Sequence, residues 1–258
     1  MTVEVDSTPT LEVTQGIARI SLRRPRYHNR LHAEDLVAIS EHLAKVDADQ
    51  GIRVLVIQAE VRAERPVFCS GFHIGQFDDG EPPLTLEKLM LSLEKVRPVT
   101  ICALNGSIYG GATDFLLASD IVLAHDQVQL RLPTAAIGIQ YHPTGLIRYV
   151  NQVGVRAAKY AILTAEHIDA KTLQRWGVIQ ELCAADLLDS RVDELANKIA
   201  GLAPLALDAV KQSLNEIARG NPDMEVLEAR SAALINSEDF AEGRRAFAER
   251  RAPRWKGC

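Results

Sequence analysis

Two apolar runs, residues 54–58 (VLVIQ) and residues 99–104 (VTICAL), constrain the fold of this chain more than any other feature. Both are rich in β-branched residues, and a strand formed by either run would bury both of its faces. Strands of this kind belong to parallel sheets covered by helices. Because helical spacing over residues 85–96 separates the two runs, we expect parallel strands joined by a right-handed crossover.

The segments around these runs extend the α/β pattern. Alternating apolar residues over 11–22 predict a hairpin that turns at Gln15 and Gly16, and helical spacing follows over 29–46. A helix over 110–118 and a strand over 121–124 form the next unit. After Gly154 the pattern is helical. The expected helices are residues 156–163, 170–176, 184–200, 204–219 and 224–235. We therefore expect an α/β core followed by a helical C-terminal part.

Charge excludes one class of partner. The 258 residues carry 29 Lys+Arg against 34 Asp+Glu, a net charge of −5. Broad contact with the phosphates of a nucleic acid needs a basic face, so we expect no nucleic-acid partner. Apolar stretches are interrupted before 18 residues, which predicts no membrane span. The first residues show no secretory or transit pattern, so a cytoplasmic location is expected.

The four cysteines, Cys69, Cys102, Cys183 and Cys258, are widely spaced. This spacing favours neither a disulfide framework nor a zinc ribbon, and we expect a reducing compartment and no metal site. His28 and His32 lack a neighbouring Cys or carboxylate at ligand spacing. Cys69 is interpreted as a small apolar loop residue.

Glycine-containing turns follow both buried runs: Cys69-Ser70-Gly71-Phe72 and residues 105–111 (NGSIYGG). Loops at the carboxyl ends of parallel strands form the binding crevice of α/β sheets. Gly110 and Gly111 stand at an expected helix start, where unpaired N–H groups favour an anion. The alternative is that both glycines only permit a tight turn. No dinucleotide, P-loop or serine-hydrolase glycine motif occurs in the sequence.

Residues 66–74 (PVFCSGFHI) and 105–114 (NGSIYGGATD) resemble the crotonase, or enoyl-CoA hydratase/isomerase, superfamily. The resemblance continues through residues 20–31, 119–124, 163–170 and 237–251. It implies an α/β fold of the crotonase type: a ββα superhelix with an acyl-CoA site over 1–195. Residues 196–258 would then be a helical region for oligomerisation or capping. The resemblance also implies a homotrimer or a dimer of trimers.

The family's substrate is a thioester, usually of coenzyme A, whose carbonyl oxygen lies between two backbone N–H groups. By position these donors would belong to Phe72 and Gly111. Such donors stabilise an enolate oxyanion more than the ground-state carbonyl. Coenzyme A would enter as part of the substrate, and no separate cofactor is implied.

The expected catalytic residues are Asp114, Thr134, Tyr141 and His142. Family hydratases use two glutamates, and Asp114 and Thr134 occupy their positions. A threonine cannot replace a carboxyl acid, which disfavours hydration by two carboxylates. Tyr141 aligns with a tyrosine of methylmalonyl-CoA decarboxylase-like members, and His142 falls where isomerases and dehalogenases of the family place an aspartate. Structural roles remain open: Asp114 as a first-turn helix residue, and the other two as a polar loop pair.

Coenzyme A is anionic, and on a chain with net charge −5 it needs local cations. The resemblance assigns its binding to a basic loop and the chain end, with Arg26 as the closest match among Arg23, Arg24, Arg26 and Arg30; a solvated basic turn is the alternative. The expected contacts are Arg26, His28, Ser70, Gly71, His73 and Lys256. His73 could instead orient its loop. His125 and His167 are expected on exposed connections.

Several functions fit these observations. The leading one is a family enzyme that acts on an acyl-CoA thioester through an enolate. A decarboxylase or double-bond isomerase that uses Asp114, Tyr141 or His142 is the alternative mechanism. A non-catalytic acyl-CoA-binding paralogue would keep the glycine turns without proton transfer. An unrelated α/β binding protein would bind no coenzyme A.

Overall fold

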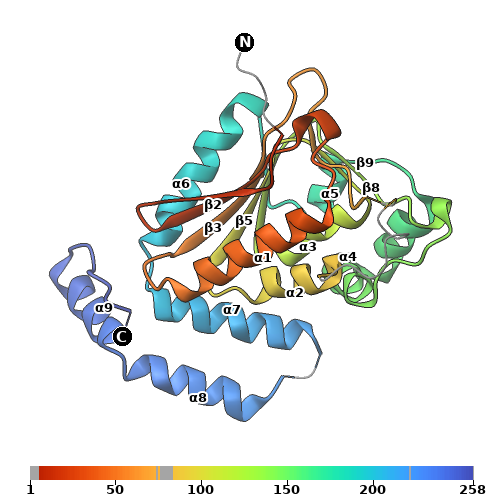
Figure 1. Cartoon of the computed structure of the whole chain (residues 1–258). Helices are drawn as coiled ribbons and strands as arrows, with labels where there is room; N and C mark the ends of the chain where they lie inside the picture. The colour runs from red at the N-terminus through yellow and green to blue at the C-terminus, as the bar shows by residue number, and fades with distance from the viewer. Residues whose placement is uncertain (1–5, 74, 76–83, 221, 258) are drawn as a thin grey trace.

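A computed structural model describes residues 6–73, 75, 84–220 and 222–257, and a six-stranded sheet forms its centre (Figure 1). The strand order is β1-β2-β3-β5-β7-β10. Their bounds are β1 Thr10–Thr14, β2 Ile17–Leu22, β3 Val54–Ala59, β5 Val99–Leu104, β7 Ile121–His125 and β10 Glu181–Cys183. The two apolar runs are β3 and β5, which pair in parallel as predicted, and β1 and β2 form the expected antiparallel hairpin.

Helices cover both faces of this sheet. Alternation along β3 sends Leu55 and Ile57 toward one face and Val54 and Val56 toward the other. On the first face lie α1 (Ala33–Ala48), α2 (Leu86–Lys95) and α3 (Asp114–Ala118). On the second lies α6 (Leu188–Ala200), whose apolar side chains pack on β3, β5 and β7. The strands are thus buried on both faces, which explains their continuous apolar character.

A second sheet places the glycine loops. It contains β4 (Val67–Cys69), β6 (Ser107–Tyr109), β8 (Gln129–Arg131) and β9 (Ile168–Asp169), in that order. Strands β4, β6 and β8 pair in parallel, and β9 is antiparallel to β8. Because β3, β5 and β7 are each followed by a strand of this sheet, the chain winds through repeated ββα turns. This arrangement confirms the expected superhelix.

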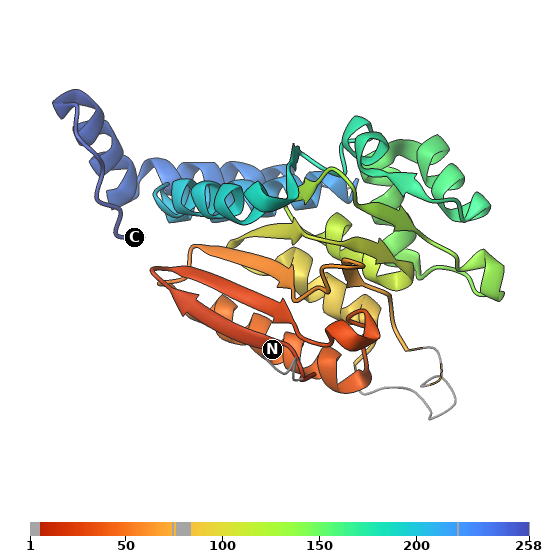
Figure 2. The same cartoon turned by 90° about the horizontal axis from the view of Figure 1, so that it is seen from above.

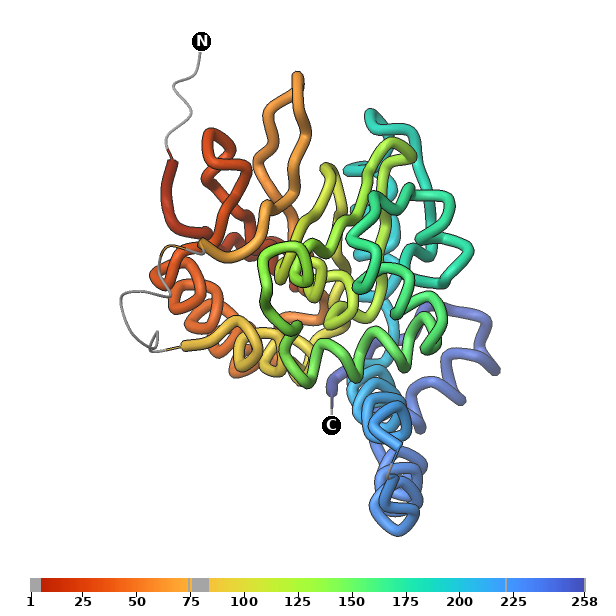
Figure 3. The backbone as a smooth tube through the Cα atoms, turned by 90° about the vertical axis from the view of Figure 1, so that its right-hand side faces the viewer, coloured from red at the N-terminus to blue at the C-terminus, as the bar shows by residue number. Residues whose placement is uncertain are grey.

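The remaining helices lie mostly in the second half of the chain. Their bounds are α4 Pro143–Thr164, α5 Ala170–Arg175, α7 Pro204–Ala218, α8 Met224–Ile235 and α9 Glu238–Glu249. Short 3-10 turns are η1 Pro25–Tyr27, η3 Gly110–Thr113, η4 Ala135–Ile137 and η5 Ala185–Leu187. Figures 2 and 3 show the last helices (blue) projecting from the core. Within the described residues, no helix is both long and apolar enough to cross a membrane.

The structure differs from several sequence predictions. The helix expected from residue 29 begins at Ala33, because η1 and the left-handed residues His28 (φ 53°) and Asn29 (φ 51°) precede it. The helix expected over 156–163 is the second part of α4, since Gly154 (φ 76°, ψ 158°) breaks the helical backbone between the parts. The prediction for His125 was wrong, because this side chain ends β7 and is buried. His167 is exposed as expected.

The expected domain boundary at residue 195 falls inside α6, which packs on the sheet as far as Ile199. Helix α7 follows and contacts both β5 and α8. Cys69 and Cys102 are buried free thiols, and Cys183 is a half-buried one. Ile74 and Cys258 lie outside the described residues.

Candidate active site

The two glycine loops meet backbone to backbone. Gly71 follows β4 with φ +100°, and Gly110 follows the neighbouring strand β6 with φ +59°. A Cβ atom at Gly71 would lie 3.2 Å from Tyr109 O and 3.7 Å from Gly111 N. Positive φ angles disfavour a side chain at both positions, and at Gly71 the close approach of Tyr109 O leaves little space for one as well. The approach places Gly111 N beside the Gly71–Phe72 segment.

Hydrogen bonds fix the segment around Phe72. Leu31 N donates to Gly71 O at 2.9 Å, and His73 N donates to Leu31 O at 2.9 Å. This pairing forms a parallel bridge between Leu31 and Phe72. On the other loop, a Cβ atom at Gly111 would lie 2.6 Å from Cδ2 of Leu86, so the start of α2 closes over this glycine. The expected carbonyl-binding residues Phe72 and Gly111 thus belong to adjoining, well-anchored loops.

Asp114, three residues after Gly111, is the first residue of α3 and is completely buried. Arg148 Nη1 donates to its Oδ2 at 2.5 Å, while its Oδ1 has no hydrogen-bond partner in the described part of the chain. Burial raises the pKa of Asp114 to about 7, against the opposing effect of Arg148 and with support from Glu94 and Glu87. The carboxyl group can therefore gain or lose a proton near neutral pH.

His142 lies beside this carboxyl group. It precedes α4, and its Nδ1 accepts a hydrogen bond from Gly145 N at 3.1 Å. A neutral ring that accepts at Nδ1 carries its proton on Nε2, and Nε2 lies 3.4 Å from Asp114 Oδ2. Burial lowers the pKa of His142, which keeps the ring neutral at pH 7. The His142 side chain is 18% exposed and Asp114 is 0% exposed, so the imidazole is the outer member of the pair.

Tyr141 connects this pair to the glycine loops. Its hydroxyl donates to Gly111 O at 3.2 Å, and its ring centroid lies 4.4 Å from that of His142. Burial raises the pKa of Tyr141 well above its ordinary value, so the hydroxyl keeps its proton. Tyr149 donates to Thr113 Oγ1 at 2.8 Å in the same cluster. Tyr141 therefore fixes the Gly111 carbonyl group in this structure.

Thr134, the fourth expected catalytic residue, precedes η4 and is buried. Its carbonyl oxygen accepts hydrogen bonds from Ile137 N at 3.2 Å and Ile139 N at 3.1 Å. A neutral hydroxyl at this position cannot act as a carboxylic acid. Of the four expected catalytic residues, Asp114 is the one with a carboxyl group, and His142 lies beside it.

Most of the residues expected to bind coenzyme A share one region. Ser70 N donates to His28 O at 2.9 Å, which joins the loop after β4 to the loop after β2. The His73 ring lies 4.9 Å from the ring of His32. The Arg26 side chain is 56% exposed, with Nε 4.0 Å from Asp6 Oδ2.

Other basic residues of this region are tied to acids. Arg23 pairs with Glu60 at 2.5 Å, and Arg24 pairs with Glu34 and Asp35. Lys256 is not brought to the loops within this chain, because its ammonium group lies 2.8 Å from Glu238 on α9, close to the chain end marked in Figure 1. Among the described residues, no group of three or more His, Cys, Asp and Glu side chains could hold a metal ion.

Sequence reasoning missed Arg148 and Glu94. Arg148 on α4 is almost completely buried, and its Nε and Nη2 donate to Glu94 Oε2 at 3.1 and 2.9 Å. The available signal was a single arginine between Ile147 and Tyr149 in an amphipathic helix. The arginine can be recognised as a site residue only after the structure shows that the helix directs its guanidinium group into the protein.

The fold and site together define a class: ββα-superhelix proteins with two adjoining glycine loops beside a buried carboxyl group. The family model described as enoyl-CoA hydratase/isomerase matches residues 12–258. The chain therefore belongs to the enoyl-CoA hydratase/isomerase family, which confirms the resemblance seen in its motifs.

Relatives and solved structures agree with this assignment. The chain is 30% identical to the carnitinyl-CoA dehydratase of Proteus mirabilis, over 95% of this chain and 97% of the relative. It is 32% identical to the carnitinyl-CoA dehydratase of Salmonella arizonae, over 93% and 95%. The crystal structure of enoyl-CoA hydratase from Bacillus anthracis superimposes with a TM-score of 0.89 at 25% identity, covering 98% of this chain and 100% of that one. The crotonase fold is thus confirmed.

Proposed function

We propose that this protein is an enzyme that acts on an acyl-CoA thioester, with the thioester oxygen held between the backbone N–H groups of Phe72 and Gly111. The observation that carries this proposal is the contact of the Gly71 and Gly110 loops, which places Gly111 N next to the Phe72 segment. Two backbone donors at one oxygen stabilise the negative charge of an enolate. Relatives at 30% and 32% identity that are named carnitinyl-CoA dehydratases support a lyase reaction.

In this proposal Asp114 moves the proton. Its ionised carboxylate removes a proton from the α-carbon of the thioester: the C–H bond breaks, the O–H bond forms at Oδ1, and the electron pair moves to the thioester oxygen. Oδ1 is the free oxygen, because Oδ2 is occupied by Arg148. A pKa of about 7 suits a group that must both take and return a proton. His142 Nε2 lies 3.4 Å from Oδ2 without a hydrogen bond in this structure, so the imidazole is a neighbour of the carboxyl group and Arg148 is the group that holds it.

With Asp114 as the proton carrier and Thr134 at the second position, the site has one catalytic carboxyl group. A two-carboxylate hydratase would use two. The enolate can then expel a leaving group from the β-carbon, or take a proton back from Asp114 at a different carbon. In a decarboxylase the same enolate would form by release of CO₂, with the electrons of the broken C–C bond moving to the thioester oxygen. A dehydratase, an isomerase and a decarboxylase share the enolate and differ in the substrate that supplies it. The Tyr141 hydroxyl is engaged by Gly111 O, which favours a positioning role for this side chain.

Deuterium exchange tests the proposal directly. Short acyl-CoA thioesters are incubated with the protein in D₂O, and incorporation at the α-carbon is followed by mass spectrometry. We expect exchange in the wild type, a loss of about 10²–10⁴-fold in Asp114→Asn and a smaller loss in His142→Gln. His42→Gln is the control, because His42 lies on α1, where its Nε2 contacts Pro9 O.

Enoyl and malonyl-type substrates, tested in parallel for turnover, separate dehydratase or isomerase activity from decarboxylation. Thioester binding without exchange or turnover would contradict the proposal and support a non-catalytic paralogue. Absence of binding would contradict the substrate class itself.

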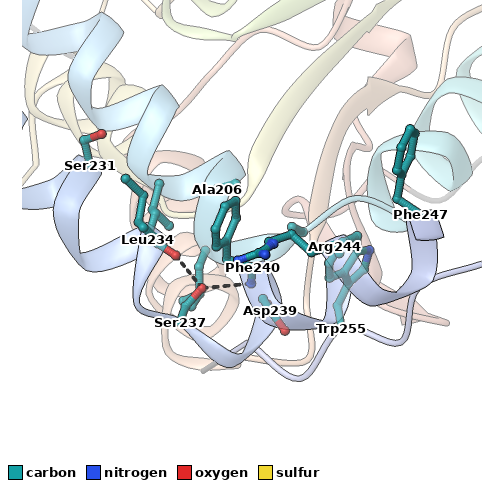
Figure 4. Close-up of a pocket in the computed structure, with 13 residues that line it drawn as sticks. Ala206, Ser231, Leu234, Ser237, Asp239, Phe240, Arg244, Phe247 and Trp255 are labelled. Atoms are coloured by element: carbon teal, nitrogen blue, oxygen red, sulfur yellow. Dashed lines mark hydrogen bonds between the residues drawn. The ribbon is translucent and has the colours of Figure 1, made fainter. Parts of the chain in front are cut away.

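We also propose that the protein is a homotrimer or a dimer of trimers. The support is the apolar surface of the projecting C-terminal helices. An apolar pocket of about 620 Å³ lies between the start of α7 and helices α8 and α9 (Figure 4). Phe247 on its rim is 88% exposed, and Phe240 is 45% exposed. Monomeric proteins seldom leave large apolar areas in contact with water.

A further inference from the structure

Arg148 is shared by two carboxylates that come from different helices. Its Nη1 donates to Asp114 on α3, and its Nε and Nη2 donate to Glu94 on α2. Arg219, at the end of α7, contacts the other Glu94 oxygen at 3.4 Å. Glu94 thus stands behind Arg148 as seen from the proton-transfer carboxyl group. Asp114, Arg148 and Glu94 form the buried part of this network, Arg219 is partly exposed, and a buried charge is costly unless an opposite charge offsets it.

The charged groups around Arg148 can be counted. Three carboxyl groups face it, Glu87 and Glu94 from α2 and Asp114 from α3, against the guanidinium groups of Arg148 and Arg219. His142, Tyr141 and Tyr149 complete the surroundings on α4 and the residues before it, and burial favours the neutral form of each. One of the three carboxyl groups must carry a proton for the cluster to be neutral.

Burial determines which of the three carboxyl groups carries the proton. The Asp114 side chain is 0% exposed, that of Glu94 is 18% exposed and that of Glu87 is 31% exposed. Glu87 also accepts a hydrogen bond from Thr144 N at 3.1 Å, which favours its ionised form. Glu94 accepts two hydrogen bonds from Arg148. Asp114 is the least hydrated of the three, so the neutral acid is favoured there.

We propose that Glu94 is a positioning residue for proton transfer: by offsetting the charge of Arg148, it allows Asp114 to hold the proton that the reaction moves. This inference rests on the proposed function, which makes Asp114 the proton carrier. Without Glu94, the guanidinium charge would act on Asp114 alone, and the carboxylate would be too stable to take a proton from carbon near neutral pH.

The test measures the proton on Asp114 without substrate. The infrared carbonyl stretch of a protonated carboxyl group is titrated with pH and assigned by its loss in Asp114→Asn. In Glu94→Gln we expect the proton affinity of Asp114 to fall about tenfold. Glu94→Asp keeps the charge and should remain close to the wild type. Glu41→Gln, which removes the same charge from an exposed position on α1, should change nothing.

A second variant covers the case in which Glu94→Gln fails to fold. Arg219→Gln alters a partly exposed side chain and leaves Glu94 free to act more fully on Arg148, so the proton affinity of Asp114 should rise. Unchanged titration in folded Glu94→Gln, or a shift in the opposite direction in either variant, would overturn the inference. Where Glu94→Gln does not fold, unchanged titration in Arg219→Gln would overturn it.

Deuterium exchange separates this inference from the proposed function. If both hold, the midpoint of the pH dependence of exchange moves to lower pH in Glu94→Gln together with the infrared titration. Exchange by the wild type with an unchanged Asp114 titration in Glu94→Gln refutes the role of Glu94 alone. A shifted titration in a protein that shows no exchange refutes the proposed function, and with it any use of this proton in catalysis.

Discussion

Asp114 carries a proton in the folded chain at a pH where an ordinary aspartic acid is ionised. Its pKa is raised from 3.8 to about 7 because burial disfavours the carboxylate. The folded state therefore binds this proton more tightly than the unfolded state. The resulting stabilisation is fully present below about pH 4 and is lost as the pH rises toward 7. The residue that suits proton transfer thus also makes stability depend on pH.

This linkage gives a prediction for unfolding. The free energy of unfolding of the wild type should fall by roughly 2–4 kcal/mol between pH 4 and pH 7, relative to Asp114→Asn, in which this titration is absent. Urea denaturation at a series of pH values measures the difference. Asp169→Asn serves as control: hydrogen bonds from Thr172 lower the pKa of Asp169, so it titrates below this range. Parallel curves for wild type and Asp114→Asn would refute the raised pKa.

At the scale of residues, the sequence predicted the groups whose chemistry is local. Gly71 and Gly110 follow directly from their places after strands and at a helix start, whereas Asp114 was named through the family resemblance. The partners of Asp114 could not be predicted in this way. Glu94 and Arg148 are 54 residues apart in the chain and meet through the packing of α2 on α4. Such a pair depends on tertiary geometry that no local pattern encodes.

Helix α7 is held to the sheet by a buried charge. Lys211 is almost completely buried, its ammonium group lies 2.7 Å from Asp120 Oδ2, and it donates to Pro98 O at 2.8 Å. Asp120 precedes β7, and Pro98 precedes β5. A single side chain therefore joins α7 to the beginnings of two neighbouring strands.

Removal of this charge should destabilise the protein. Lys211→Met leaves the Asp120 carboxylate without its cation, and we expect a loss of about 3 kcal/mol in the free energy of unfolding. Chemical denaturation of the variant measures this loss. Lys198→Met, at an exposed position on α6, should change stability by less than about 0.5 kcal/mol. Equal stability of the two variants would show that the buried pair contributes nothing to the docking of α7.

Elements with a strong apolar pattern were predicted well. Helices whose pattern is interrupted by proline, glycine or many charged residues were not. The strands β3 and β5 were recognised because each is buried on both faces. The first half of α4 was missed, since Tyr141, His142 and Pro143 mark a loop in the sequence while His142 and Pro143 begin the helix in the structure. Helix α9 was assigned to a helical tail only through the family resemblance, because its charged residues dominate its short apolar pattern.

The whole molecule is asymmetric: a covered α/β core carries a thin helical arm formed by α8 and α9 (Figure 1). Phe240, Phe247 and Trp255 give this arm an apolar surface beside α7 (Figure 4). The proposed association with further copies would cover this surface.

Phe247→Ser tests the association. Its side chain contributes little to the single chain, because it is 88% exposed, so the variant should fold normally. In the proposed assembly it should weaken association and shift the protein toward smaller species at micromolar concentration. Sedimentation velocity measures the distribution, and circular dichroism checks the fold. Leu163→Ser, at a residue 69% exposed on α4, is the comparison for an apolar side chain outside the arm. Wild-type protein that sediments as a monomer would contradict the assembly.

The contact between Gly71 and Gly110 depends on main-chain atoms, whereas the carboxyl and imidazole groups beside it depend on side chains. Main-chain atoms form it, and the strands β4 and β6 hold them in place. The proposed proton carrier Asp114 and its neighbour His142 contribute side chains instead, so a single substitution can alter either one without changing the main-chain contact. If the proposed function holds, the binding of a carbonyl oxygen can therefore stay unchanged while the proton chemistry beside it changes. A chain built in this way has a ready route to new reactions.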